Sequence, residues 1–310
     1  MKQALPWDTS GDVAAYHQAI QNLGGGGKNR FGRPMRLDIS WRLDFDDNKA
    51  WNTWKSNADS LRLDRDDISS ESPAEFGPIQ RTVERYRRWI NQQALNPARR
   101  DQPIMIRPDM DNLWVGNKEG HQFSKLTDVQ RYTQAILWVG AGANLITGSD
   151  MNSIDDIGKK LLFDDEEFMD IAGFTSNWPM VPRNTDDTPT PGGGDARQLS
   201  AWIAGPNDEG TAVVILSNLG EDQCLGNGAN DDCSYGTEWH DVHLVSISLE
   251  NLGIGGDDWF VRRVSGGGSK NAGSDHTDIG KTTGKIECNL DHYESVMYKL
   301  QKCGTGGVQC

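Results

Sequence analysis

Three features are absent from the sequence or scarce in it, and the first two argue against particular binding partners. No stretch approaches 18 consecutive apolar residues, so a membrane-spanning helix and a membrane partner are not expected. Basic residues are in the minority, with 31 Lys and Arg against 45 Asp and Glu, which gives a formal net charge of −14 at pH 7. Such an acidic chain is not expected to bind nucleic acid, because phosphate backbones would repel it. The first residues also lack the apolar middle of a signal peptide.

Motifs for metals and phosphates are missing as well. The five cysteines form no C-x-x-C pair, so no metal site is predicted. The Gly-rich stretch 266–275 has neither the lysine nor the strand-to-helix context of a phosphate-binding loop. We therefore interpret that stretch as a flexible loop.

All five cysteines lie in the last third of the chain. Cys224 and Cys233 bracket the polar run LGNGANDD, whose ends can easily meet, so we predict a disulfide between them. Such a bridge fits an extracellular destination. The sequence leaves the pairing of Cys288, Cys303 and Cys310 open.

Composition and length indicate two domains. A chain of 310 residues exceeds the length at which one core usually suffices. A segment rich in Pro, Gly, Thr and Asp, residues 184–197, reads as a linker between residues 1–183 and residues 198–310. Eleven Trp and 35 Gly suit a loop-rich protein with aromatic surfaces, a composition often found where sugars are bound.

Strand-like and helix-like patterns alternate through the first predicted domain. This alternation predicts parallel strands joined by helical crossovers. Thr127 is predicted to cap the helix that follows it. The predicted strands are residues 33–40, 60–66, 103–109 and 143–150, and the predicted helices are residues 9–24, 48–60, 78–95, 126–142 and 153–162.

Carboxylates follow the carboxyl end of every predicted strand. In parallel α/β folds, ligands bind at that edge of the sheet. We therefore predict an acidic rim that meets a polar substrate, although any one of these aspartates could instead cap a helix or form a turn. The residues are Asp44 and Asp46, Asp64 and Asp66, Asp109 and Asp111, and Asp150.

The pattern changes after the linker. Short apolar or alternating runs between Gly-rich turns predict an antiparallel β-sandwich over residues 198–310. These runs are residues 197–205, 211–220, 240–250, 259–265 and 285–301.

Five blocks of the sequence resemble successive blocks of glycoside hydrolase family 27, the α-galactosidases, in the form found in fungi. They occur in order and cover roughly residues 10 to 250. The resemblance implies a (β/α)8 barrel followed by an antiparallel β-sandwich, with this chain holding about strands five to eight of the barrel. The blocks are RLDISW (36–41), ADSLRLDRD (58–66), IRPDMDNLWVGN (106–117), RYTQAILWVGAGANLITGSDM (131–151) and QLSAWIAGPND (198–208).

Family members cleave terminal α-galactosyl units with retention, using one aspartate as nucleophile and another as general acid/base, and they need no cofactor. The resemblance gives the acid/base role to Asp66, four residues after the substrate-binding Arg62. Arg42 and Asp46 share this spacing, but Arg42 directly follows the Trp of the preceding strand, so we prefer the first pair. Arg62 could instead form only a structural salt bridge with Asp64 or Asp66.

The resemblance also places substrate contacts on neighbouring strands. Trp41, with Ser40 before it, falls where the family contacts the 2-substituent of the sugar, and Asp109 and Met110 fall on the pocket floor. The residues before Trp41 lack the cysteine that many α-galactosidases carry there. The substrate therefore stays open between an α-galactoside, an N-acetylgalactosaminide and an α-glucan.

In the family, the nucleophile belongs to a Lys-x-Asp-Tyr type of block on the fourth barrel strand. The 310-residue sequence contains no such block before its first predicted helix. We expect the chain to begin after that strand and, alone, to be inactive or nearly so. Its half barrel would expose unpaired edges and favour self-association. The parent protein is expected to be secreted. The alternative is a noncatalytic carbohydrate-binding or scaffold protein derived from the same fold.

Overall fold

The computed structural model of the protein describes residues 10–23, 26–29, 31–40, 48–64, 75–90, 106–116, 124–183, 198–220, 242–266, 275–305 and 310. Several predicted features lie outside these residues. They are Trp41, Asp66, the rival pair Arg42 and Asp46, Asp44, the Cys224–Cys233 disulfide and the linker 184–197.

A short parallel sheet forms the N-terminal part of the described structure. Its strands β1 (Asp38–Ile39), β2 (Ser60–Arg62) and β3 (Arg107–Asp109) lie in the order β1-β2-β3, and both pairings are parallel, as the alternation predicted. Each strand is shorter than the predicted segment. Helices α1 (Ser10–Gln21), α2 (Asn48–Asn57) and α3 (Phe76–Trp89) alternate with them along the chain.

The prediction of a fourth regular strand over residues 143–150 is wrong. Thr147 forms only an isolated parallel bridge with Leu113, where Leu113 N–H donates to the Ile146 carbonyl over 2.8 Å. The segment keeps the parallel direction but not a continuous ladder. Next to it, a Cβ on Gly148 would stand 2.7 Å from the Trp114 ring, so this close approach requires glycine.

Helices follow the parallel strands. In α4 (Asp128–Gly140) the predicted cap is confirmed, because Thr127 and Gln130 form a reciprocal capping box. Beyond α5 (Asp156–Lys159) and a π-helical turn (Lys160–Asp164) comes α6 (Glu166–Thr175), which the sequence analysis did not predict. Among the described residues, no helix is both long enough and apolar enough to cross a membrane.

The C-terminal part is antiparallel throughout. A six-stranded sheet has the order β4-β5-β6-β11-β8-β9, and a two-stranded sheet pairs β10 with β7. Strand β4 comes before residue 184, the first residue of the predicted linker, yet it pairs with β5 on the far side of that segment. The elements are β4 (Val181–Arg183), β5 (Leu199–Ala204), β6 (Thr211–Asn218), β7 (His243–Ser248), α7 (Leu249–Leu252), β8 (Trp259–Gly266), β9 (Thr277–Thr282), β10 (Lys285–Leu290) and β11 (Ser295–Lys302).

A disulfide joins Cys303, which directly follows β11, to Cys310. Its Cα atoms are 5.6 Å apart, which is an ordinary separation for a disulfide. The sequence analysis left these two cysteines unassigned. Cys288 has a free thiol inside the β region, and burial, the main cause, raises its pKa.

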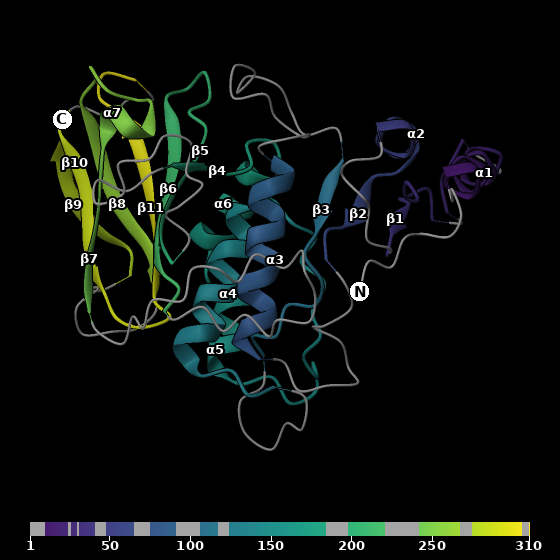
Figure 1. Ribbon diagram of the computed structural model, residues 1–310, viewed down its shortest axis with the longest axis horizontal. Coiled ribbons are helices and arrows are strands. Elements are labelled where there is room, and N and C mark those ends of the chain that lie inside the picture. The colour runs from purple at the N-terminus through teal and green to yellow at the C-terminus, as the bar shows by residue number, and fades with distance from the viewer. Residues whose placement is uncertain are drawn as a thin grey trace.

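Helices α3, α4 and α6 lie between the parallel sheet and the antiparallel sheets (Figure 1). The Tyr86 hydroxyl of α3 donates to the Met180 carbonyl over 2.6 Å, and the Arg87 guanidinium lies 4.7 Å from the centroid of the Trp202 ring. A Cβ on Gly140, the last residue of α4, would come within 2.3 Å of Ile215 in β6. The helical layer therefore packs closely on the antiparallel sheet and positions the parallel strands relative to it.

A second set of contacts joins α6 to the antiparallel sheet, through His276 directly before β9 and Arg262 in β8. The ring contacts carboxylates on both sides, with Nδ1 3.0 Å from Glu167 Oε2 and Nε2 3.2 Å from Asp165 Oδ2. Arg262 Nε also approaches Glu167 Oε2, at 3.1 Å. Burial raises the pKa of Glu167, but hydrogen bonds from His276 and Arg262 outweigh burial and lower the pKa below its ordinary value.

We predict that Glu167→Gln destabilises the protein at pH 7 by about 1 kcal/mol, because it removes a partly solvated charged pairing. A carboxyl whose pKa is lowered on folding contributes stability above its unfolded pKa, and that stability is lost as the pH falls through its folded pKa. The loss should therefore shrink in acid. Thermal unfolding between pH 3 and pH 7 measures it, with exposed Glu166→Gln as the matched control. Equal effects of both substitutions at every pH would contradict this role.

Candidate active site

The carboxyl ends of β2 and β3 hold a buried arginine between two buried carboxylates. Arg62 Nε lies 2.7 Å from Asp109 Oδ2, and Arg62 Nη1 lies 3.1 Å from Asp111 Oδ2. The exposed fraction is 8% for Arg62, 0% for Asp109 and 4% for Asp111. Charges removed from water to this extent are tolerated only when they are paired, so each partner depends on the others.

Strand alternation explains why these side chains meet. The register pairs Arg62 with Asp109, and it pairs Leu61 with Pro108 one residue earlier. Side chains at successive positions point to opposite faces of a sheet, so Arg62 and Asp109 share one face while Leu61 lies on the other. Leu61 is fully buried. The polar face and the apolar core therefore come from the same short strands.

The turn after β3 places a second carboxylate, that of Asp111, next to Arg62. Asp111 has a positive φ of 67°, a conformation that Asp adopts more readily than most residues. Its N–H donates to Asp109 Oδ1 over 2.8 Å, and its carbonyl accepts from Trp138 Nε1 over 3.1 Å. These bonds fix the turn, so Asp111 reaches Arg62 with its side chain. The prediction that Asp109 and Asp111 lie together at a strand end is confirmed by this geometry.

The sequence analysis missed one member of this cluster, Asp38. Its Oδ1 accepts from the Ser60 hydroxyl over 2.5 Å. Burial and the charge of Asp109 raise the pKa of Asp38, against the opposing effects of Ser60 and Arg62. The available signal was a carboxylate inside an apolar strand pattern rather than after it, two residues before Ser40.

Two other strand-end aspartates make local contacts instead. Asp64 pairs with α3, at 2.6 Å from Arg81 Nε and 3.7 Å from Arg85 Nε. Asp150 is exposed and accepts from the Asn152 N–H over 3.0 Å, as a turn former does. The expectation that every strand end contributes to one acidic rim is therefore wrong for these two residues, because nearer partners take their carboxylates.

Two further predicted contact residues are described. Ser40 is exposed and directly follows β1, the strand that pairs with β2. Met110 has an exposed fraction of 0% and belongs to the hydrophobic core. Met110 is thus buried like its neighbour Asp109.

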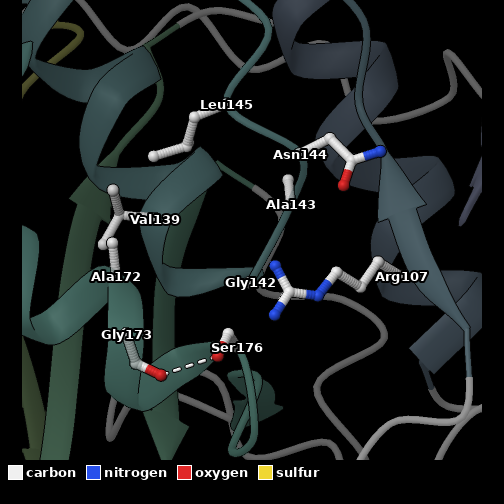
Figure 2. A pocket seen from close by; sticks show the side chains of 9 residues that line it. All are labelled: Arg107, Val139, Gly142, Ala143, Asn144, Leu145, Ala172, Gly173 and Ser176. Carbon is white, nitrogen blue, oxygen red and sulfur yellow. Dashed lines mark hydrogen bonds between the residues drawn. The ribbon is translucent and has the colours of Figure 1, made fainter. Parts of the chain in front are cut away.

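A cavity of about 390 Å³ lies near Arg107, the first residue of β3, whereas Asp109 is the last residue of that strand. Figure 2 shows the Arg107 guanidinium pointing into it, opposite apolar walls from α4 and α6 such as Val139 and Ala172. Burial and the nearby charge of Arg36 lower the pKa of Arg107. Ligands of parallel α/β folds bind at the carboxyl ends of the strands, so we locate the candidate site at Asp109 and not in this cavity.

The described residues contain no group of three or more His, Cys, Asp or Glu side chains that could hold a metal ion. In the charged cluster, Arg62 supplies the positive charge that pairs with the carboxylates of Asp109 and Asp111. The arrangement therefore holds the guanidinium of Arg62 in a fixed position at the strand ends.

No family model matches the chain. The chain is 38% identical over 301 residues to alpha-galactosidase 3 of Hypocrea jecorina, an alignment that covers 96% of this chain. The chain is therefore similar to a fungal α-galactosidase over almost its whole length. "Putative alpha-galactosidase 8" of Emericella nidulans is 36% identical over 251 residues, an alignment that covers 80% of this chain. The chain spans only 42% and 46% of the lengths of these two relatives.

Solved structures show a similar fold. A GH27 β-L-arabinopyranosidase from Geobacillus stearothermophilus aligns with a TM-score of 0.68 at 16% identity, over 98% of this chain and 57% of that one. Alpha-galactosidase I from Mortierella vinacea aligns with a TM-score of 0.60 at 14% identity, over 96% of this chain and 64% of that one. The similarity of fold extends over both the parallel and the antiparallel parts of this chain.

We predict that Arg62→Met destabilises the protein by about 3 to 5 kcal/mol, because it leaves Asp109 and Asp111 buried without their cation. Adding Asp109→Asn should recover part of that loss, since one stranded charge is then removed. Urea unfolding measures both effects, and Arg33→Met, at an exposed arginine, is the control. A loss for Arg62→Met no larger than that of the control would show that the cluster is not a buried charge network.

Proposed function

We propose that this protein is the acid/base half of a retaining α-galactosidase-type glycoside hydrolase, acting on terminal α-galactosyl units. The observation that carries the proposal is the buried cluster of Arg62 with Asp109 and Asp111 at the ends of two parallel strands, in a chain that is 38% identical to an α-galactosidase. Asp66, four residues after Arg62 in the sequence, is the proposed general acid/base.

Arg62 acts in this proposal as a rigid hydrogen-bond donor to sugar hydroxyls. Two carboxylates fix its guanidinium, so the group does not have to be ordered when a sugar binds. Buried Met110 would support the pocket floor beneath Asp109, and exposed Ser40 would face the substrate beside Trp41. Two carboxylates against one guanidinium suit uncharged polar ligands better than anionic ones.

Retaining hydrolysis needs two carboxyl groups about 5 to 5.5 Å apart, one attacking the anomeric carbon and the other protonating the leaving oxygen. In the second step the same acid/base group, now a carboxylate, takes a proton from the attacking water. Residues outside these 310 would supply the nucleophile, in line with the part of the relatives that the chain does not cover. No cofactor is required for this chemistry.

The same proposal extends to the architecture. The parallel part would be the C-terminal half of a (β/α)8 barrel within residues 1–183, and residues 198–310 would form the β-sandwich domain. Strand β1 has β2 as its partner on one side only, so within the described residues this end of the sheet is an edge. Such an edge would pair with the remaining barrel strands or, without them, with a second copy of the chain.

Secretion of the parent protein is part of the proposal and is supported by the Cys303–Cys310 disulfide. The choice among galactose, N-acetylgalactosamine and glucose as the terminal sugar depends on the contacts of Ser40 and Trp41 with the 2-substituent. Hydrolysis rates on the three p-nitrophenyl α-glycosides would rank them.

The activity test compares this chain with a fusion that adds the part of the Hypocrea jecorina relative that the chain does not cover. With p-nitrophenyl α-galactoside, we predict hydrolysis by the fusion and a rate at least about 1000-fold lower for the chain alone, since removing a nucleophile costs several orders of magnitude. In the fusion, Asp66→Asn should abolish hydrolysis, whereas exposed Asp12→Asn should not.

Equal rates for the chain and the fusion would contradict the proposal that the nucleophile lies elsewhere. A fusion that folds and binds galactose but never hydrolyses the substrate would favour the noncatalytic carbohydrate-binding protein. An Asp66→Asn fusion with full activity would remove Asp66 from the acid/base role.

A further inference from the structure

We propose that the cavity beside Arg107 binds a small organic carboxylate, with the carboxylate at the Arg107 guanidinium and an apolar body against helices α4 and α6. The cavity has a volume of about 390 Å³. Small-molecule sites in proteins typically measure about 300 to 1,000 Å³, so this cavity has room for one small ligand. The proposal does not rest on the proposed function, because Arg107 and Asp109 lie at opposite ends of β3.

Arg107 gives the cavity its positive charge. The guanidinium points into the cavity, as Figure 2 shows, and the residue is half-buried. Within the residues that the structure describes, this guanidinium makes no hydrogen bond or ion pair. Arg62 in the neighbouring strand, by contrast, lies 2.7 Å from Asp109. The donors of the Arg107 guanidinium are therefore available to a ligand.

The surroundings of Arg107 favour an anionic group. Burial, the larger cause, and the nearby charge of Arg36 lower the pKa of Arg107, because both disfavour its charged form. A carboxylate would offset both effects with an opposite charge. The planar guanidinium also matches a carboxylate through two parallel hydrogen bonds. Charge and shape thus select a carboxylate at this end of the cavity.

The opposite wall of the cavity is apolar. It carries the side chains of Val139 in α4, Ala172 in α6 and Leu145. Ala172 and Leu145 pack against the hydrophobic core but are only partly buried. An apolar body that covers them would be stabilised by removing this surface from water. An inorganic anion could not make these contacts.

The helix ends beside the cavity orient the ligand. The Val139 carbonyl already accepts from the Gly142 N–H over 3.0 Å, and the Gly173 carbonyl accepts from the Ser176 hydroxyl over 2.7 Å. The last turns of α4 and α6 also carry partial negative charge, which disfavours a carboxylate next to them. The carboxylate is therefore directed toward Arg107 and the apolar body toward the helices.

The walls of the cavity are held by close backbone contacts. Gly142 has a φ of 62°, and a Cβ there would stand 2.5 Å from the Thr175 carbonyl oxygen, so this approach of the chain to α6 requires glycine. The Asn144 N–H donates to the Pro108 carbonyl over 3.1 Å and ties the following residues to β3. A site fixed in this way costs little free energy to order when a ligand binds.

Benzoate is a suitable probe because it joins a carboxylate to an apolar ring, and benzamide is its uncharged match. Ligand-observed NMR titrations on the 310-residue chain at pH 7 measure the affinities of both. We predict that benzoate binds at least about tenfold more tightly, because only benzoate accepts charge-assisted hydrogen bonds from Arg107. Inorganic phosphate at the same ionic strength should displace little of the benzoate, since phosphate has no apolar body.

Substitutions at Arg107 test the charged end. Arg107→Met removes the guanidinium but keeps much of the stem, so the affinity for benzoate should fall at least about tenfold, while that for benzamide stays nearly unchanged. Arg107→Lys keeps the charge without the planar fork and should lose less. Arg33→Met, at an exposed arginine outside the cavity lining, is the matched control and should change neither affinity.

Ala172→Leu tests the apolar end and keeps the experiment decisive if Arg107→Met does not fold. Leucine is well tolerated in helices, and its larger side chain would occupy part of the cavity. Binding of benzoate and of benzamide should both be lost. Ala15→Leu, at an exposed position of α1, is the control and should bind both as wild type does.

Four results would overturn the proposal. The first is the absence of saturable benzoate binding, and the second is equal affinity of wild type for benzoate and benzamide. The third is full benzoate affinity in Arg107→Met or in Ala172→Leu, which would place the ligand elsewhere. The fourth is displacement by phosphate as effective as by benzoate itself, which would show a plain anion site.

D-Galactose separates this cavity from the candidate active site. Because Arg107 and Asp109 lie at opposite ends of β3, saturating benzoate should leave the affinity for D-galactose unchanged. Competition between the two ligands would place benzoate at the candidate active site and overturn the second site. Absence of galactose binding would count against the proposed function alone, since the benzoate titrations need no sugar.

Discussion

The buried ion pair between Arg62 and Asp109 is the constraint on which the rest of the candidate site depends. Both groups lie almost wholly out of water, so neither is tolerated unless the other is within hydrogen-bond distance. Their contact requires that β2 and β3 keep one register, because a shift by one residue would turn one of the two side chains to the opposite face. The charge pair thus specifies the strand pairing as well as the site.

The surrounding structure gives that constraint its rigidity. The positive φ of Asp111 is held by the Asp109 carboxylate and by Trp138 of α4, so the second carboxylate is fixed from two sides. Helix α4 packs in turn on β6 of the antiparallel sheet at Gly140 and Ile215. The β-sheet part is therefore mechanically connected to the site through one helix, which gives it a supporting role even without contacts to a ligand.

The sequence predicted the parts of this arrangement that depend on local pattern. Alternating strands and helices, the Thr127 cap and the proximity of Asp109 and Asp111 follow from periodicity and from the rule that parallel strands end at one edge. Helix α6 was missed because its apolar pattern directly follows that of the preceding helix, and the π-helical turn between them has no clear sequence signal.

The errors concern choices between partners. Asp64 and Asp150 have the same strand-end position as Asp109, yet one pairs with Arg81 of α3 and the other stabilises a turn. Only the packing of α3 against β2 decides the first case, and that information is not local. Asp38 was missed for the opposite reason, because a carboxylate within a strand reads as a surface residue until the neighbouring strand β2 supplies Ser60 as its partner.

The central claim is that the Arg62 cluster faces a bound sugar with Asp66 beside it. A crystal structure of the fusion with the Hypocrea jecorina part, soaked with D-galactose, tests this claim most directly through the distances from the sugar to Arg62 and Asp66. The account predicts hydrogen bonds from the guanidinium to a sugar hydroxyl and the Asp66 carboxyl within reach of the anomeric oxygen. Galactose bound elsewhere, or an Asp66 carboxyl directed away from the cluster, would contradict it.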